Sequence, residues 1–244
     1  MGHLKAVVFD VDGTLADSER DGHRVAFNQA FADAGLPDRW DVDAYGGLLA
    51  VTGGQQRLRT YLASRGYDAE AATRLADDLH RAKTGLFREM VVDGRIPLRP
   101  GVRRLVDELC LAGVRLFVAT TGSRQWVEPL LHHHFGAATF ELTLTGSEVS
   151  RLKPDPAVYL EVLGRAVLQP PGVVAVEDSA NGLAAAQAAG LSCLVVTNDY
   201  TAEDDLQSAD LVVDGFGPAA KRIAGGCAPL PGGSVTASTL AALV

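Results

Sequence analysis

Four short apolar runs along the chain have the length and composition of buried strands. Each is four to six residues long and rich in valine or other aliphatic residues, with few polar positions. The runs are Ala6–Phe9, Val114–Ala119, Val173–Val176 and Ser192–Val196. Apolar runs of this length that lack an alternating polar face are typical of strands in a parallel sheet, because helices cover both faces of such a sheet.

Helical patterns lie between these runs. Arg103–Leu111 places Leu105, Val106 and Leu109 on one face, and the alanine-rich segment Asn181–Ala189 is followed by Gly190, a residue that commonly ends helices. Strands that alternate with helices predict an α/β fold, a doubly wound parallel sheet with helices on both faces.

About a hundred residues separate the first apolar run from the second, which is too long for a simple crossover. Apolar residues in this interval recur every three or four positions from Ala72 to Met90, and Val25–Ala34 also has a helical pattern. We therefore expect a helical cap domain at 18–92, inserted into a catalytic α/β core formed by 1–17 and 93–244. The two connections, around Leu15–Glu19 and Asp93–Arg99, are expected to act as a hinge.

Composition narrows the classes of function. The 244 residues are 47% apolar and 21% charged, with a formal net charge of −8. The apolar fraction is sufficient for a large buried core, and the negative net charge argues against binding of nucleic acid or anionic lipid. The first apolar run lacks the layout of a signal peptide, and the longest uncharged stretches are broken by glycine or proline. We expect a cytoplasmic protein with no membrane span that acts as a monomer.

The three cysteines do not form a recognisable pattern. Cys110, Cys193 and Cys227 are odd in number and far apart, which argues against a disulfide framework or a zinc site. We expect them to be reduced thiols in the core.

Polar residues follow three of the predicted strands. Asp10 and Asp12 follow the first, Thr120 the second, and Glu177 with Asp178 the third, and the loop Lys153-Pro154-Asp155-Pro156 lies between the second and the third. The carboxyl ends of parallel strands meet at one edge of the sheet, so we expect the four carboxylates to converge there. Buried carboxylates need a cation, and all-oxygen ligands favour Mg²⁺. Asp10, Asp12, Glu177 and Asp178 are the candidate metal ligands.

This set of residues suits phosphoryl transfer. Asp10 can attack phosphorus and form an aspartyl phosphate, and Asp12 can protonate the leaving oxygen and then activate water. Thr120 and Lys153 complete the catalytic group by binding the phosphoryl oxygens. Thr121, Gly122 and Ser123 are expected to contact the substrate. Trp126 suits either the lining of the substrate pocket or packing.

These residues resemble the motifs of the haloacid dehalogenase-like hydrolase superfamily, which Asp10-Val11-Asp12-Gly13-Thr14, Thr120, Lys153 and Glu177-Asp178 match. The position of the cap looks like that of the β-phosphoglucomutase-like branch. Within it, the segments that begin at Glu19, Thr52 and His80 look like the CbbY group. The resemblance implies a Mg²⁺-dependent phosphatase of xylulose-1,5-bisphosphate, and it carries substrate-binding roles onto Glu19, His23, Thr52, Gly53, Gly54, Arg57, His80 and Lys83.

The cap residues also admit simpler interpretations. Gly53-Gly54 before an amphipathic run offers backbone donors at a helix start, or is a plain turn. His80 and Lys83 share one side of a helix, which binds substrate or faces solvent. Glu19 and His23 contact sugar hydroxyls or each other. Gln55-Gln56 stands where the group commonly has Lys-Glu.

Two other enzymes and one non-enzyme fit the same motifs. A sugar phosphomutase of the same branch and a phosphatase of another sugar monophosphate use the same aspartates. A phosphorylation-dependent receiver module also combines aspartates, a hydroxyl residue and a lysine on a doubly wound sheet. The long insert and the order of the carboxylates along the chain argue against the receiver.

Overall fold

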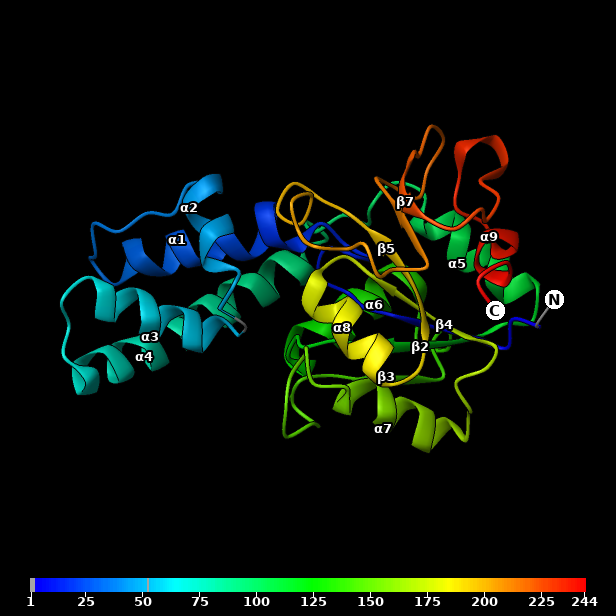
Figure 1. The fold of residues 1–244 in the computed structure, drawn as a ribbon. Coiled ribbons are helices and arrows are strands. Elements are labelled where there is room, and N and C mark those ends of the chain that lie inside the picture. Colours follow the sequence, from blue (N-terminus) through cyan, green and yellow to red (C-terminus); the bar gives the residue numbers. More distant parts are fainter. Residues whose placement is uncertain (1–2, 52) are drawn as a thin grey trace. The chain divides into compact units, whose positions relative to one another are not determined.

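A computed structural model describes residues 3–51 and 53–244, which divide into two compact units (Figure 1). One unit runs up to Asp17 and resumes at Pro97, and the other, the cap, is Ser18–Ile96. The cap extends four residues beyond the expected limit at 92. One reason is that Ile96 packs inside it, where a Cβ built on Gly22 would lie 2.9 Å from Ile96 Cδ1.

The core unit is built on one seven-stranded sheet in the order β3-β2-β1-β4-β5-β6-β7. All neighbouring pairs are parallel except β6 and β7. The strands are β1 (Ala6–Phe9), β2 (Arg115–Ala119), β3 (Leu142–Leu144), β4 (Val173–Glu177), β5 (Ser192–Val196), β6 (Leu211–Val213) and β7 (Arg222–Gly225). The predicted doubly wound fold is confirmed, and the four predicted strands form its centre.

Helices connect the strands and bury the sheet. They are α5 (Val102–Leu111), α6 (Arg124–Phe135), α7 (Ala157–Ala166), α8 (Ala180–Ala188) and α9 (Ala237–Ala241), with a short 3-10 turn at Pro231–Gly233. Alternate residues of a strand point to opposite faces. Ala6 and Val8 of β1 therefore share a face, which packs on Val158 of α7 and Leu183 of α8 in one buried cluster.

The cap unit consists of helices around an aromatic core. Its elements are η1 (Glu19–His23), α1 (Arg24–Asp33), α2 (Val42–Leu48), α3 (Gly54–Ser64) and α4 (Ala69–Val92), and α4 packs against both α1 and α3. Trp40 is 1% exposed, and its ring centroid lies 4.9 Å from those of Phe27 and Phe31. Asp41 and Asp68 cap α2 and α4 by accepting hydrogen bonds from backbone N–H groups.

The expectation for the cysteines is correct only for Cys193. Cys193 lies on β5 and is fully buried, but Cys110 and Cys227 are exposed. Cys110 is next to the last residue of α5, beyond the face formed by Leu105, Val106 and Leu109. Among the helices in the described part of the chain, none combines the length and the apolar character needed to cross a membrane.

Candidate active site

The register of the sheet brings the polar strand ends together. Phe9 at the end of β1 pairs with Val118 of β2 on one side and with Val176 of β4 on the other. Asp10, Thr120 and Glu177 therefore lie at the same edge, as expected from the sequence. All three are buried, with exposed fractions of 5%, 1% and 1%.

Lys153 joins this group from the loop before α7. Its ammonium donates hydrogen bonds to Asp10 Oδ1 at 2.7 Å, to Glu177 Oε1 at 2.6 Å and to the backbone carbonyl of Ala119 at 2.8 Å. The peptide bond between Lys153 and Pro154 is cis. The lysine thus bridges residues from β1, β2 and β4.

Glu177 is held by two further features. The hydroxyl of Tyr159 on α7 donates a hydrogen bond to Glu177 Oε1. Gly182 on α8 leaves room for the carboxylate, because a Cβ at that position would lie 1.8 Å from Glu177 Oε2. The side chain therefore has little freedom to change its position.

Asp178 lies against the loop that follows β1. Its Oδ2 accepts a hydrogen bond of 2.7 Å from the side-chain amide of Asn198, which follows β5. Gly13 has a φ of +77°, and a Cβ on it would lie 2.1 Å from Asp178 Oδ2. Glycine fits this position for two reasons: it adopts the left-handed backbone conformation without strain, and it lets the loop approach Asp178 closely.

The buried group formed by Asp10, Lys153, Glu177 and Asp178 has more acidic than basic side chains. Oxygen atoms of Asp10, Glu177 and Asp178 all lie within 4.8 Å of one another. Burial and the neighbouring Glu177 raise the pKa of Asp10 to about 8, although Lys153 opposes this shift. Burial, Asp10 and Glu177 likewise raise the pKa of Asp178 well above its usual value. Burial alone would lower the pKa of Lys153, but Asp10 and Glu177 outweigh it and raise it.

This imbalance fits a divalent cation. Three buried carboxylates share one lysine, and a cation would relieve the repulsion that raises the two aspartate pKa values. The oxygen-only set suits Mg²⁺. The carboxylate of Asp12 is not part of this set of three. Asp12 lies on the loop after β1 and is half-buried, and its charge contributes to the raised pKa of Asp10.

The loop after β2 is shaped by close packing. The N–H of Gly122 donates to Thr120 Oγ1 at 3.0 Å, and a Cβ on Gly122 would lie 2.3 Å from Trp126 Cζ2. Trp126 is 4% exposed, so it packs on the loop within the core unit. Among the described residues, the buried hydroxyl of Ser123 has no hydrogen-bond partner, although Ser123 is the N-cap of α6.

A second polar cluster lies within the cap. Tyr45 on α2 donates a hydrogen bond to Glu19 Oε2 and accepts one of 3.2 Å from Arg57 Nη1. Arg57 on α3 is 6% exposed and also donates to the backbone carbonyl of Leu48. Glu19 and Arg57 are therefore linked through one phenol.

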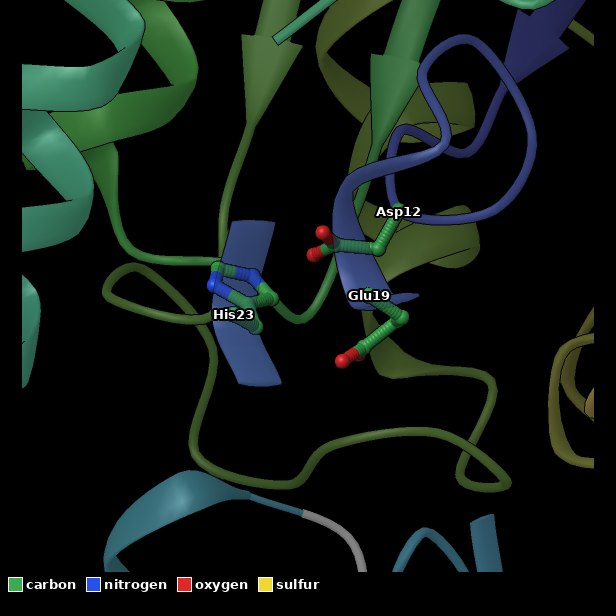
Figure 2. A group of neighbouring side chains, drawn as sticks. All are labelled: Asp12, Glu19 and His23. Carbon is green, nitrogen blue, oxygen red and sulfur yellow. The ribbon is translucent and has the colours of Figure 1, made fainter. Parts of the chain in front are cut away.

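His23 and Lys83 form the other half of this cluster. Lys83 Nζ lies 2.8 Å from His23 Nδ1, and both residues are about 5% exposed. An ammonium only donates, so Lys83 is the donor in this pair and Nδ1 of His23 is the acceptor. Figure 2 displays Glu19 and His23, which lie on the same turn, η1. The buried Lys83 does not face solvent, which removes the simpler interpretation for that residue.

His80, midway along α4, lies beside the start of α3, where the two glycines are. A Cβ on Gly54, the first residue of α3, would lie 3.3 Å from His80 Cδ2. Burial, Lys83 and His23 lower the pKa of His80 to about 4. Gly53 is the N-cap of α3 with a φ of +88°. Thr52, the remaining residue expected to bind substrate, lies outside the described residues.

Gln55 is engaged elsewhere in the cap. Its amide donates to Asp77 Oδ1 at 2.6 Å, and Arg59 binds the same oxygen at 2.9 Å. Asp77 lies on α4, so this pair joins α3 to α4.

Sequence reasoning missed three residues of the core group: Tyr159, Gly182 and Asn198. Asn198 could have been found, because it follows a predicted strand in the same way as Asp10 does. Tyr159 has the apolar surroundings of an ordinary core helix, and its hydroxyl carries no signal in the sequence. Gly182 looks like any glycine in the first turn of a helix.

Comparison with known proteins agrees with the resemblance to haloacid dehalogenase-like hydrolases that the sequence motifs indicated. The family model of haloacid dehalogenase-like hydrolases matches residues 4–190. The protein CbbY of Rhodobacter capsulatus is 42% identical over 225 residues, which cover 90% of this chain and 96% of that protein.

Two solved structures are also similar. A crystal structure of CbbY from Rhodobacter sphaeroides with phosphate superposes with a TM-score of 0.79, is 41% identical, and covers 87% of this chain and 94% of that one. A mutant of the same protein with xylulose-(1,5)bisphosphate gives a TM-score of 0.78 at 40% identity and the same coverage. The chain therefore belongs to the haloacid dehalogenase-like hydrolase family and is an enzyme of the phosphatase class.

Proposed function

We propose that the chain is a Mg²⁺-dependent phosphatase of small sugar phosphates and that its preferred substrate is xylulose-1,5-bisphosphate. The observation that carries this proposal is the presence of two separate buried cationic sets. Lys153 lies among the core carboxylates, and Arg57 with Lys83 lies within the cap. A bisphosphate requires two such sets. The related structure with xylulose-(1,5)bisphosphate supports the choice of sugar.

The first step is transfer of the phosphoryl group to Asp10. A carboxylate oxygen of Asp10 forms a bond to phosphorus, and the bond between phosphorus and the sugar oxygen breaks. Asp12 gives its proton to that oxygen, so the sugar leaves as an alcohol. Lys153 and the hydroxyl of Thr120 bind the charged phosphoryl oxygens.

The second step returns the enzyme to its starting state. Asp12, now ionised, takes a proton from water while the water oxygen bonds to phosphorus. The bond between phosphorus and Asp10 breaks, and inorganic phosphate leaves. Asp12 is protonated again, so atoms and charge balance over the cycle.

Asp10, Glu177 and Asp178 would hold the Mg²⁺ ion, with Asp12 contributing from the neighbouring loop. When bound, the ion neutralises the phosphoryl oxygens and the carboxylates that would otherwise repel them. In the chain itself, Lys153 keeps Asp10 and Glu177 in place, and Asn198 orients Asp178.

The cap is proposed to bind the phosphate that does not react. Arg57 and Lys83 would neutralise it, and Glu19, His23 and His80 would contact the sugar. The loop from Thr121 to Ser123 would contact the reacting phosphate. Arg57 and Lys83 already have partners in the protein, so the substrate would use their remaining N–H donors.

A panel of phosphate esters tests the substrate. Purified protein with Mg²⁺ is given xylulose-1,5-bisphosphate, xylulose 5-phosphate, glucose 1-phosphate and 4-nitrophenyl phosphate, and release of phosphate is measured. We expect kcat/KM to be highest for the bisphosphate, with release of one phosphate per molecule. Isomerisation of a sugar monophosphate without phosphate release would instead identify a phosphomutase.

A further inference from the structure

Arg99 contacts the backbone of two loops that lie next to the core carboxylates. Its guanidinium donates hydrogen bonds to three backbone carbonyls: Gly13, Val196 at 3.1 Å and Thr197 at 2.7 Å. The backbone N–H of Arg99 donates a further hydrogen bond to the backbone carbonyl of Leu15 at 3.0 Å. The side chain also lies over the ring of Phe216, at 5.8 Å from the centroid. One residue thus joins the loop after β1 to the loop after β5.

The two loops that Arg99 joins are the ones that position Asp178. Gly13 is the residue that packs directly against Asp178 Oδ2, and it follows Asp12 in the chain. Thr197 precedes Asn198, whose amide donates to the same oxygen. Arg99 therefore binds the segments on both sides of one carboxylate. Among the described residues its hydrogen bonds go to backbone carbonyls and not to the oxygens of Asp178, whose charge nevertheless acts on the guanidinium.

The chemistry of the guanidinium suits this task. Its donors lie in a fixed plane, so carbonyls on two segments can be held at a set spacing. Hydrogen bonds from a charged donor are stronger than neutral ones, and a carbonyl left without a donor in a buried place is costly. The ammonium of lysine also has three donors, but all of them are on one atom at the end of a flexible stem, so it does not hold the carbonyls of two segments at the spacing that the two terminal nitrogens of Arg99 set.

We propose that Arg99 is a positioning residue that sets the distance between the Asp12–Gly13 loop and Asp178, and so controls metal affinity and turnover. The inference rests on the proposed function, because it takes these carboxylates as the groups that hold Mg²⁺ and transfer phosphate. Residues that orient metal ligands from behind typically change metal affinity or activity by about 10- to 100-fold when replaced.

Arg115 provides a matched control. It is also half-buried, and its guanidinium also donates to a backbone carbonyl, that of Ala166 at 3.2 Å, as well as to Glu141. It is the first residue of β2, whereas Thr120 follows the last residue of that strand. Its contacts therefore lie at the opposite end of the sheet from the carboxylates.

The test compares Arg99→Lys with Arg115→Lys in three measurements on the full chain. Titration calorimetry gives the Kd for Mg²⁺, steady-state kinetics give kcat and KM for 4-nitrophenyl phosphate, and thermal unfolding gives Tm. For Arg99→Lys we expect the Mg²⁺ Kd to rise and kcat to fall by roughly 10- to 100-fold each. The KM, measured at saturating Mg²⁺, should stay within about threefold, because Arg99 is not proposed to touch substrate. Arg115→Lys should lower only Tm.

A purely structural role would give a different pattern. A lower Tm for Arg99→Lys with an unchanged Mg²⁺ Kd and kcat would overturn the inference, as would equal effects in both variants. Arg99→Gln retains a planar donor and provides the same comparison if Arg99→Lys does not fold. Failure of the wild type to hydrolyse any ester would contradict the proposed function, whereas the Mg²⁺ Kd would still decide the role of Arg99.

Discussion

The ammonium of Lys153 lies 2.7 Å from Asp10 Oδ1, although 143 residues separate the two in the chain. The same ammonium reaches Glu177 at 2.6 Å, so one lysine serves carboxylates from two adjacent strands. With Asp178 nearby, the group retains excess negative charge.

Replacing two helical glycines by alanine distinguishes the packing role of Gly182 from the general effect of alanine on a helix. Gly182→Ala should reduce kcat at least tenfold, because the new methyl group would occupy the place of Glu177 Oε2. A Cβ added to Gly164 on α7 would meet no other described residue within 4 Å, apart from its chain neighbours and the backbone of its own helix. Gly164→Ala should leave kcat unchanged and stabilise the protein by up to about 1 kcal/mol, as alanine does in exposed helices. Steady-state kinetics and chemical denaturation of both variants check this prediction.

The raised pKa of Asp10 predicts how metal binding depends on pH. Its usual pKa is 3.8 and its value in the folded protein is about 8, so folding favours the protonated form. The contribution of protonated Asp10 to the free energy of unfolding is complete below pH 3.8 and is lost as the pH rises through 8. Mg²⁺ must displace that proton, so its affinity should weaken by roughly tenfold for each pH unit below 8.

Thermal unfolding with and without Mg²⁺ measures this effect. We expect the increase in Tm caused by Mg²⁺ to be much larger at pH 8.5 than at pH 6. Asp10→Asn cannot bind this proton and serves as the control, and its dependence on pH should be flatter. An equal increase in Tm at both pH values in the wild type would mean that Asp10 is not protonated in the metal-free protein.

Lys83 should determine selectivity for a second phosphate. A charge-assisted hydrogen bond contributes about 1.5–3 kcal/mol, so Lys83→Met should lower kcat/KM for xylulose-1,5-bisphosphate by roughly 10- to 100-fold. Arg57→Met should act in the same direction. The loss on 4-nitrophenyl phosphate should be much smaller, because this ester has no second phosphate.

Arg81 offers a control on the same helix. It lies two residues from Lys83 on α4, its side chain is 78% exposed, and it forms a surface ion pair with Asp78. Arg81→Met should leave both substrates unaffected. If Lys83→Met slows both substrates equally, the cap does not recognise the second phosphate.

Local patterns explain why the centre of the fold could be predicted. The strands β1, β2, β4 and β5 are continuous apolar runs, and the polar residues after them identified Asp10, Thr120, Glu177 and Asp178. The strands β3, β6 and β7 lie toward the edges. The first two are only three residues long, and β7 begins with an arginine, ends with a glycine and is mostly exposed, so none of them forms a long apolar run. Their pairing depends on contacts made by the whole sheet.

The contacts within the site could not be predicted in the same way. Tyr159 binds Glu177 through a hydroxyl at the tip of a residue that otherwise belongs to the core. Arg99 was expected only as part of a connection, and its role depends on three carbonyls from two distant segments. Such contacts arise from the folded backbone, and the sequence carries no local sign of them.

The turnover of Asp10→Asn tests the central claim most directly. The variant keeps the shape of the side chain but lacks the carboxylate that is proposed to attack phosphorus. With saturating Mg²⁺ and 4-nitrophenyl phosphate, we expect kcat below about one thousandth of that of the wild type, with a cooperative thermal transition retained. A kcat within tenfold of that of the wild type would contradict the assignment of Asp10 as the nucleophile.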